Sequence, residues 1–193
     1  SLPGCGLAHA VSAKKRRLAK QSGRRIVEMV KEDLTPRKIM TREALRNGIA
    51  ASMAMGASTN STLHIPAIAH EAGIELGFDD FDEISRKVPY LCNIKPSGSH
   101  PLSDLEAVGG VPAVMKMVEP LLVGSALTCT GKTVAENLKD VTVQENDVIF
   151  SLAHPKKPEG GLAVLHGSLA PDGAVVKQAG VKPSMHRFEG RAK

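Results

Sequence analysis

The character of the chain changes near residues 140–150, and this change limits the folds that it can adopt. Before it, apolar residues recur at helical spacing, whereas after it short β-prone runs alternate with turns rich in Pro and Gly. The β-prone runs are residues 148–150, 162–165 and 174–176. Three strands are too few to complete a sandwich or a barrel. We therefore predict an α/β chain of two incomplete units, with a layered α/β domain in residues 1–145 and the first strands of a second domain in residues 146–193.

The first unit carries several helix signals. Thr41 is placed to cap a helix that runs to Met55, and Gly56 can end it. Ser103 and Glu106 have the spacing of a capping box. Further helices are expected over residues 7–33, from the 56–62 run to Gly73, over 79–86 and up to Val118. The apolar residues that recur along the first helix are Leu7, Val11, Leu18, Ile26, Val27 and Val30.

The net charge of +5 comes from one segment, residues 14–25, while the rest of the chain is nearly neutral. This segment holds seven basic residues and no acidic one, namely Lys14, Lys15, Arg16, Arg17, Lys20, Arg24 and Arg25. No aromatic side chain lies near it to stack on bases, which disfavours nucleic-acid binding. Two interpretations stay open: a solvated or subunit-facing helix side, and a non-catalytic interaction module that docks an acidic partner or nucleic acid through this basic helix.

The cysteine pattern argues against a disulfide framework and against a structural zinc site. Cys5, Cys92 and Cys129 are odd in number and form no CxxC pair. A reducing cytoplasm is the simplest location for such a chain. The histidines lack the HExxH spacing, so no metal-ligating residue is assigned. The longest apolar runs fall far short of the roughly 20 residues of a membrane span, so no membrane partner is expected.

The most suggestive polar run is Gly56-Ala57-Ser58-Thr59-Asn60-Ser61-Thr62, at the start of an expected helix. Backbone N–H groups at a helix start bind anions, and short hydroxyl and amide side chains beside them add donors. The same residue types are also selected by helix capping alone. From composition, either a carboxylate or phosphate site or an elaborate cap fits this run. No residue shows the spacing of a catalytic motif, so no catalytic residue is assigned.

Several segments, in order along nearly the whole chain, resemble the dihydroxy-acid dehydratase and phosphogluconate dehydratase family. Residues 84–96 and 160–165 most resemble its dihydroxy-acid branch. The resembling segments are residues 33–44, 56–73, 84–89, 102–116, 127–133 and 160–177. The resemblance implies that the chain is a central fragment, about the middle third of the family protein, whose second unit begins a swivel-like β-barrel domain.

The resemblance also implies a function, dehydration of a 2,3-dihydroxy carboxylate to a 2-keto acid in branched-chain amino acid biosynthesis. The family uses an iron–sulfur cluster and magnesium, but its ligand motifs have no counterpart in this chain. The fragment alone is therefore expected to be inactive, and its parent to be a homo-oligomer, a dimer or a tetramer. Ser58, Thr59 and Asn60 match a family signature and are assigned to substrate binding. A sugar-acid dehydratase of the same family stays an alternative.

Overall fold

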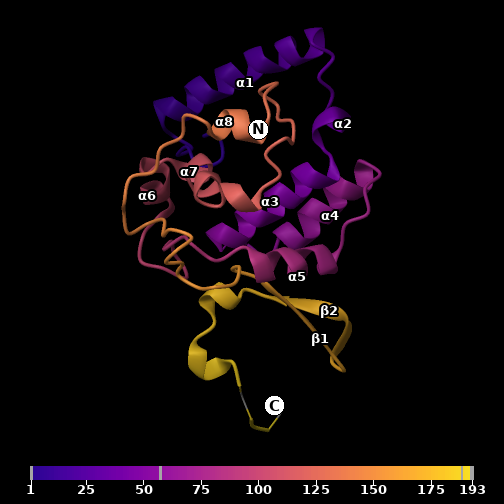
Figure 1. Ribbon diagram of the computed structural model, residues 1–193, viewed down its shortest axis with the longest axis vertical. Coiled ribbons are helices and arrows are strands. Elements are labelled where there is room, and N and C mark those ends of the chain that lie inside the picture. Colours follow the sequence, from indigo (N-terminus) through magenta and orange to yellow (C-terminus); the bar gives the residue numbers. More distant parts are fainter. Residues whose placement is uncertain (1, 57, 188, 192–193) are drawn as a thin grey trace.

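A helix-rich body with a two-stranded hairpin near its C-terminal end makes up the structure (Figure 1). This computed structural model describes residues 2–56, 58–187 and 189–191. Its α-helices are α1 Ala13–Lys31, α2 Pro36–Ile39, α3 Arg42–Met55, α4 Ser61–Glu71, α5 Phe78–Lys87, α6 Leu102–Ala107, α7 Gly110–Met117 and α8 Val134–Leu138. The strands are β1 Ala163–Gly167 and β2 Ala170–Val176, and the 3₁₀ helices are η1 Glu119–Leu121, η2 Gln178–Gly180 and η3 Pro183–Met185. A helical body with a small antiparallel sheet agrees with the predicted α/β class.

Helix α3 lies at the centre of the core, and its bounds confirm the prediction. The Thr41 hydroxyl accepts a hydrogen bond from the Ala44 N–H at 3.2 Å, and Gly56 ends the helix in the left-handed conformation with φ 62°. Ile49 and Met53 are completely buried. The same core includes residues from α5, α6 and α7 and from the segments around the sheet, namely Phe81, Ile84, Leu105, Val114, Ile149, Leu162 and Val164. One apolar core therefore joins the helical body to the start of the hairpin.

Two predicted helix starts are wrong. Helix α1 begins at Ala13 rather than near Leu7, because the Ser12 hydroxyl caps it by accepting from the Lys15 N–H at 3.1 Å. Helix α6 begins directly after Pro101, whose extended backbone occupies the cap position, so Ser103 lies inside the helix and cannot form the predicted capping box. A capping box does form at α8, where the Thr133 hydroxyl accepts from the Glu136 N–H at 3.2 Å and the Glu136 carboxylate accepts from the Thr133 N–H at 2.8 Å.

Three of the large apolar side chains of α1 point away from the body. Met29 is buried, but Ile26, Val27 and Val30 are 54%, 54% and 76% exposed. The inner side of the helix instead makes polar contacts, such as the 2.9 Å hydrogen bond from Lys15 Nζ to the Cys5 carbonyl. Among the described residues no helix is long and apolar enough to cross a membrane, this longest one included.

Two of the three predicted strands form the hairpin. Strands β1 and β2 are antiparallel, with Leu165 opposite Ala174. Residues 148–150 form no extended strand and make a single antiparallel bridge, Cys92 to Ile149. Among the described residues two backbone hydrogen bonds join them to residues 91–93, from the Asn93 N–H to the Val148 carbonyl and from the Phe150 N–H to the Leu91 carbonyl. The predicted division into residues 1–145 and 146–193 stays a prediction.

His100 links α6 to the segment before residue 148, and this link should make stability depend on pH. Its Nδ1 lies 3.0 Å from Asp104 and its Nε2 lies 3.2 Å from Asp147. The hydrogen bond with Asp104, followed by the charge of Asp147, raises the pKa of His100 above the ordinary 6.5. A raised pKa in the folded state stabilises the fold fully below about pH 6.5, and this contribution disappears as pH rises through the folded-state pKa.

We therefore expect the free energy of unfolding to fall as pH rises above about 6.5, and the His100→Gln variant to lose this part of the slope. Urea unfolding followed by circular dichroism at pH 5.5, 6.5, 7.5 and 8.5 measures it. His64→Gln, at an exposed histidine of α4, is the matched control and should keep the wild-type slope. Equal slopes for His100→Gln and the wild type would contradict the role of this histidine.

Candidate functional site

The predicted substrate-binding residues form the turn that leads into α4. The Ser58 hydroxyl accepts from the Asn60 N–H at 3.2 Å, and the Thr62 hydroxyl donates to the Thr59 carbonyl at 2.8 Å. Ser58 and Asn60 are exposed and Thr59 is half-buried. Within the described part of the chain, neither the Thr59 hydroxyl nor the Asn60 amide makes a hydrogen bond. The structure thus brings the three residues together with free polar groups at the start of an eleven-residue helix; Ala57 of the same run lies outside the described residues.

A joint of closely packed backbone lies directly before this turn. A Cβ added at Gly161 would lie 2.3 Å from the Gly56 Cα, and a Cβ at Gly56 would lie 2.4 Å from Cε2 of Tyr90. The Gly161 N–H donates to the Met53 carbonyl at 3.0 Å, and the Gly160 N–H donates to Ser85 at 2.8 Å. These contacts fix the segment before β1 on the C-terminal end of α3. Because the α4 turn follows α3 directly, the same end of α3 also sets where that turn begins.

A polar cluster around the buried Tyr90 adjoins this joint and was missed by sequence reasoning. Tyr90 is completely buried, and burial raises the pKa of its hydroxyl to about 12. Lys156 Nζ lies 5.5 Å from the centroid of the Tyr90 ring and donates to the Asn93 side chain at 2.6 Å and to the Ser97 carbonyl at 3.1 Å. Burial also lowers the pKa of Lys156. The cluster ties residues 90–97 to the segment that leads to the hairpin, a contact that has no local sequence signal.

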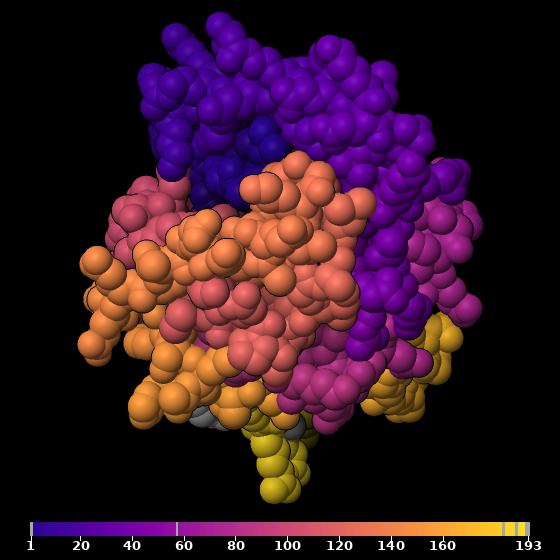
Figure 2. All heavy atoms as spheres, turned by 45° about the horizontal axis from the view of Figure 1, so that its top comes forward, coloured from indigo at the N-terminus to yellow at the C-terminus, as the bar shows by residue number. Residues whose placement is uncertain are grey.

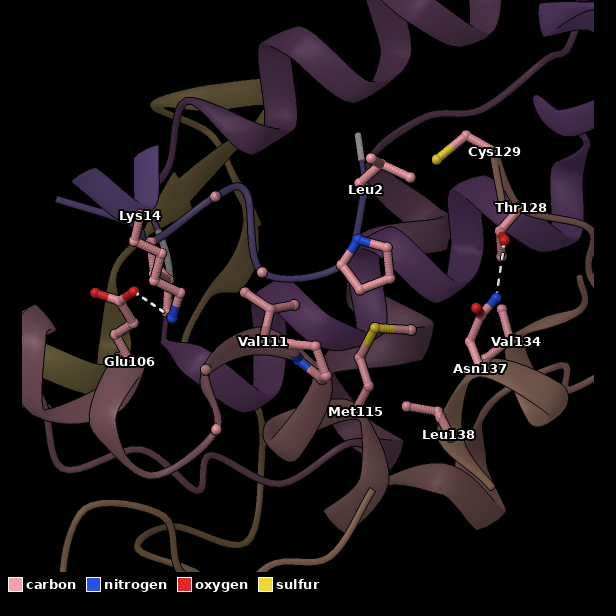
Figure 3. A pocket seen from close by; sticks show the side chains of 17 residues that line it. Leu2, Lys14, Glu106, Val111, Met115, Thr128, Cys129, Val134, Asn137 and Leu138 are labelled. Carbon is pink, nitrogen blue, oxygen red and sulfur yellow. Dashed lines mark hydrogen bonds and ion pairs between the residues drawn. The ribbon is translucent and has the colours of Figure 1, made fainter. Parts of the chain in front are cut away.

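A cavity of about 310 Å³ lies elsewhere, between the N-terminal segment, α7 and α8 (Figure 3). Its walls are mainly apolar, and the ion pair of Lys14 with Glu106, 2.7 Å long, lies at one side. The lining residues labelled in the figure also include Leu2, Val111, Met115, Val134 and Leu138. None of Ser58, Thr59 and Asn60 lines it. The structure therefore separates this cavity from the predicted binding residues.

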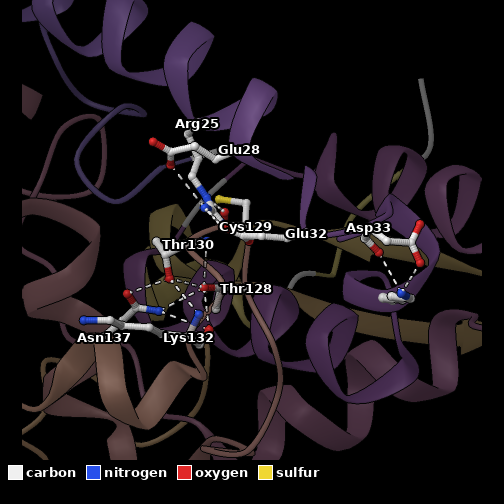
Figure 4. Close-up of polar contacts among 10 residues, drawn as sticks. Arg25, Glu28, Glu32, Asp33, Thr128, Cys129, Thr130, Lys132 and Asn137 are labelled. Atoms are coloured by element: carbon white, nitrogen blue, oxygen red, sulfur yellow. Dashed lines mark hydrogen bonds and ion pairs between the residues drawn. The ribbon is translucent and has the colours of Figure 1, made fainter. Parts of the chain in front are cut away.

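Polar contacts hold α1 against the loop that closes this cavity (Figure 4). Arg25 Nε donates to the Cys129 carbonyl at 2.7 Å, and its other nitrogens contact Glu28 at 3.3 Å and Glu32 at 2.7 Å. The loop itself is ordered by the Asn137 amide, which donates to the Thr128 hydroxyl at 2.9 Å. These groups therefore hold one another, and the loop, in place against α1.

The residues present do not fit an iron–sulfur cluster or a magnesium ion. In the described ranges no group of three or more His, Cys, Asp or Glu side chains could hold a metal. Cys92 is completely buried, and burial raises the pKa of its thiol to about 12, which disfavours the thiolate that a metal needs. Cys5 and Cys129 are half-buried. We therefore assign no ligand to these cysteines and derive no catalytic step through a metal.

We expect the 193-residue chain to take up no stoichiometric iron after anaerobic cluster reconstitution. The reason is the scattered donor set, since clusters need several thiolates in one place. Iron per chain is measured by colorimetric assay, with Cys5→Ser, Cys92→Ser and Cys129→Ser as controls. Stoichiometric iron that these three substitutions abolish would show that the cysteines are ligands after all.

Comparison with known proteins gives the family. The N-terminal profile of the dihydroxy-acid/6-phosphogluconate dehydratases matches residues 1–137, and the C-terminal profile matches residues 147–193. Proteins named dihydroxy-acid dehydratase from Methanothermobacter thermautotrophicus, Ignicoccus hospitalis and Moorella thermoacetica are 52%, 53% and 48% identical to the whole chain. The chain spans 35% of the length of each of these relatives. It belongs to the dihydroxy-acid/6-phosphogluconate dehydratase family.

Proposed function

We propose that this chain is a segment of a dihydroxy-acid dehydratase, a hydro-lyase that removes water from a 2,3-dihydroxy carboxylate and yields a 2-keto acid. The observation that carries the proposal is the identity of about half of all positions, along the entire chain, to proteins of that name. The family also includes 6-phosphogluconate dehydratases. Dehydration of a sugar acid is therefore the competing activity within the same class.

Ser58, Thr59 and Asn60 would contact the substrate in this proposal. The free Thr59 hydroxyl and Asn60 amide lie at the N-terminal end of α4, where the helix dipole favours a carboxylate. A neutral hydroxyl and amide can hold and orient a carboxylate, but they cannot exchange a proton with it near neutral pH. The part of the reaction supplied here is thus binding and orientation of the acid group.

The chemistry of the reaction is assigned to other parts of a longer protein. We infer that the iron–sulfur cluster, the magnesium ion and the groups that move protons are held by residues outside this segment, because its own donors are scattered. The segment would then span a domain division, residues 1–145 and 146–193, with Gly160 and Gly161 packing the second unit onto α3. Assembly into a homo-oligomer belongs to the same proposal.

A chimera tests this function. The matching part of the Methanothermobacter relative, 52% identical, is replaced by this chain, and keto-acid formation is measured with a branched 2,3-dihydroxy carboxylate and with 6-phosphogluconate. We expect turnover of the dihydroxy acid. A folded, metal-loaded chimera that is inactive, or one that acts on 6-phosphogluconate alone, would contradict the proposal.

The binding role of the α4 turn is tested in the same chimera. Thr59→Ala with Asn60→Ala should raise KM for the dihydroxy acid about tenfold or more, because a hydrogen bond to a charged group contributes roughly 1.5–3 kcal/mol. His70→Ala, an exposed change at the other end of α4, is the control and should leave KM unchanged. An unchanged KM in the double variant would limit these residues to helix capping.

A further inference from the structure

Gly56 is the residue at which α3 passes into the turn formed by Ser58, Thr59 and Asn60. It is buried, it has the left-handed φ of 62°, and one residue separates it from Ser58. Because the chain continues from Gly56 directly into the turn, a rotation of its backbone moves all three polar residues together. Contacts that fix Gly56 therefore also fix where these residues lie relative to the core.

Backbone N–H groups from two distant segments complete the end of α3, where the last carbonyls of a helix have no partner within it. The Ala54 carbonyl accepts from the Leu91 N–H at 2.8 Å and from the Cys92 N–H at 3.2 Å. The Met53 carbonyl accepts from the Gly161 N–H at 3.0 Å. The segment with Gly161 leads into the last part of the chain, whose yellow atoms lie at the lower edge of the molecule (Figure 2). The end of α3 is thus held by contacts that are not local in sequence.

The ring of Tyr90 lies directly against Gly56. A Cβ added at Gly56 would lie 3.0 Å from Cδ2 and from Cζ of this ring, and closer still to Cε2. The Tyr90 side chain is completely buried. Its N–H donates to the Lys157 carbonyl at 3.1 Å and to the Glu159 carbonyl at 3.0 Å, and its carbonyl accepts from the Lys157 N–H at 3.2 Å. Because the backbone of Tyr90 is held and its side chain is enclosed, the ring is a rigid neighbour of Gly56.

The hydroxyl of Tyr90 adds no hydrogen bond to this arrangement. It is buried, and no group in the described part of the chain pairs with it. A buried hydroxyl without a partner costs stability rather than adding to it. The contribution of Tyr90 to the joint is therefore that of its ring, which is large and has few rotamers.

We propose that Tyr90 is a positioning residue for substrate binding: its ring holds Gly56 in place, and Gly56 holds the turn of Ser58, Thr59 and Asn60. This role rests on the proposed function, in which the turn binds the substrate carboxylate. Hydrogen bonds depend steeply on the position of the donor, and a displacement of about 1 Å is enough to weaken them strongly. The ring thus acts on binding through the backbone, without touching the substrate.

Hydrogen exchange on the 193-residue chain tests whether the ring holds the turn. The readout is the amides of residues 61–64, which donate to the carbonyls of residues 58–60. Tyr90→Met fills the core with a flexible apolar side chain but lacks the ring. We expect these amides to exchange at least about fivefold faster in Tyr90→Met than in the wild type, because the turn opens more often. Tyr90→Phe keeps the ring and should exchange like the wild type.

Phe81→Met is the matched control, because Phe81 is another completely buried ring of the same core. It should lower the urea midpoint, as Tyr90→Met does, but leave the exchange of residues 61–64 close to that of the wild type. Circular dichroism shows whether each variant is folded. Tyr90→Leu, which also removes the ring, takes the place of Tyr90→Met if that variant does not fold.

Kinetics of the chimera test the consequence for the substrate. Tyr90→Met should raise KM for the dihydroxy acid about fivefold or more and change kcat less than about twofold, because the turn holds substrate and transition state alike. Tyr90→Phe should restore the wild-type KM, and Phe81→Met should leave KM unchanged. A residue that only fills the core would lower the free energy of unfolding without this change in KM.

Three outcomes would overturn the proposal. Exchange of residues 61–64 that stays unchanged in Tyr90→Met, or that rises equally in Phe81→Met, would limit Tyr90 to filling the core. An unchanged KM of Tyr90→Met in an active chimera would remove the link to the substrate and leave the dehydratase function intact. A folded, metal-loaded wild-type chimera without activity would contradict the proposed function itself, and the role in substrate binding with it.

Discussion

Replacement of Gly161 by alanine should strongly destabilise the fold. The new Cβ would lie 2.3 Å from the Gly56 Cα, and this neighbour is backbone that cannot rotate away. Relief requires separating the segment before β1 from α3, which stretches the hydrogen bond from the Gly161 N–H to the Met53 carbonyl. We expect a loss of about 3–5 kcal/mol in the free energy of unfolding, the upper end of what overpacking costs.

Substitutions at two further glycines serve as comparisons for this prediction. The urea midpoint of each variant is measured by circular dichroism. At Gly160 the new methyl group would meet the side chains of Met53 and Ser85 at 2.8 Å. The Met53 atom is the Cβ, which the backbone fixes, but this contact is longer than the one at Gly161, so Gly160→Ala should lose less. Gly48 lies inside α3 with no atom within 4 Å of its added Cβ, and Gly48→Ala should stabilise the chain by about 0.5–1 kcal/mol. A midpoint of Gly161→Ala equal to that of the wild type would show that this joint is loose.

Signals that act within a few residues were read correctly from the sequence. Thr41 and Gly56 mark both ends of α3 because a cap hydroxyl and a left-handed glycine act on their own neighbours. The runs at residues 162–165 and 174–176 do pair as a hairpin, since the turn between them brings them together. The three residues at the start of α4 were also found, as a turn with free polar groups, although their role in binding stays a prediction.

Features that depend on distant parts of the chain were not predictable in this way. The sequence did not indicate which side of α1 faces the body, and the inner side makes polar contacts to the Cys5 and Cys129 carbonyls. The contact between Gly56 and Gly161 joins positions far apart in sequence. The same holds for Lys156 beside Tyr90. The secondary-structure propensity of a segment does not indicate which distant parts of the chain it contacts.

Asp80 provides the second large effect, because one nearly buried carboxylate serves three donors. It accepts from Arg42 at 2.5 Å, from Arg46 at 2.7 Å and from the Gly77 N–H at 3.2 Å. Asp80→Ala would leave both guanidinium groups without this partner and remove the cap of α5. We expect a loss of about 2–3 kcal/mol in the free energy of unfolding, below the 3–5 of a fully buried pair because both arginines are partly exposed.

The chain contains a matched carboxylate on the same helix. Half-buried Asp82 contacts Arg86, one turn along and largely exposed, at 2.8 Å. Because Arg86 is exposed to water, Asp82→Ala should cost at most about 0.5 kcal/mol. Asp80→Asn keeps an oxygen that can accept from the Gly77 N–H but loses the charge, so its urea midpoint should fall between those of the wild type and Asp80→Ala. Equal midpoints for Asp80→Ala and Asp82→Ala would contradict this account. The Asp80 carboxylate would then contribute no more than an ordinary surface ion pair, and the packing of α3 against α5 would rest on the apolar contacts of Ile49, Phe81 and Ile84.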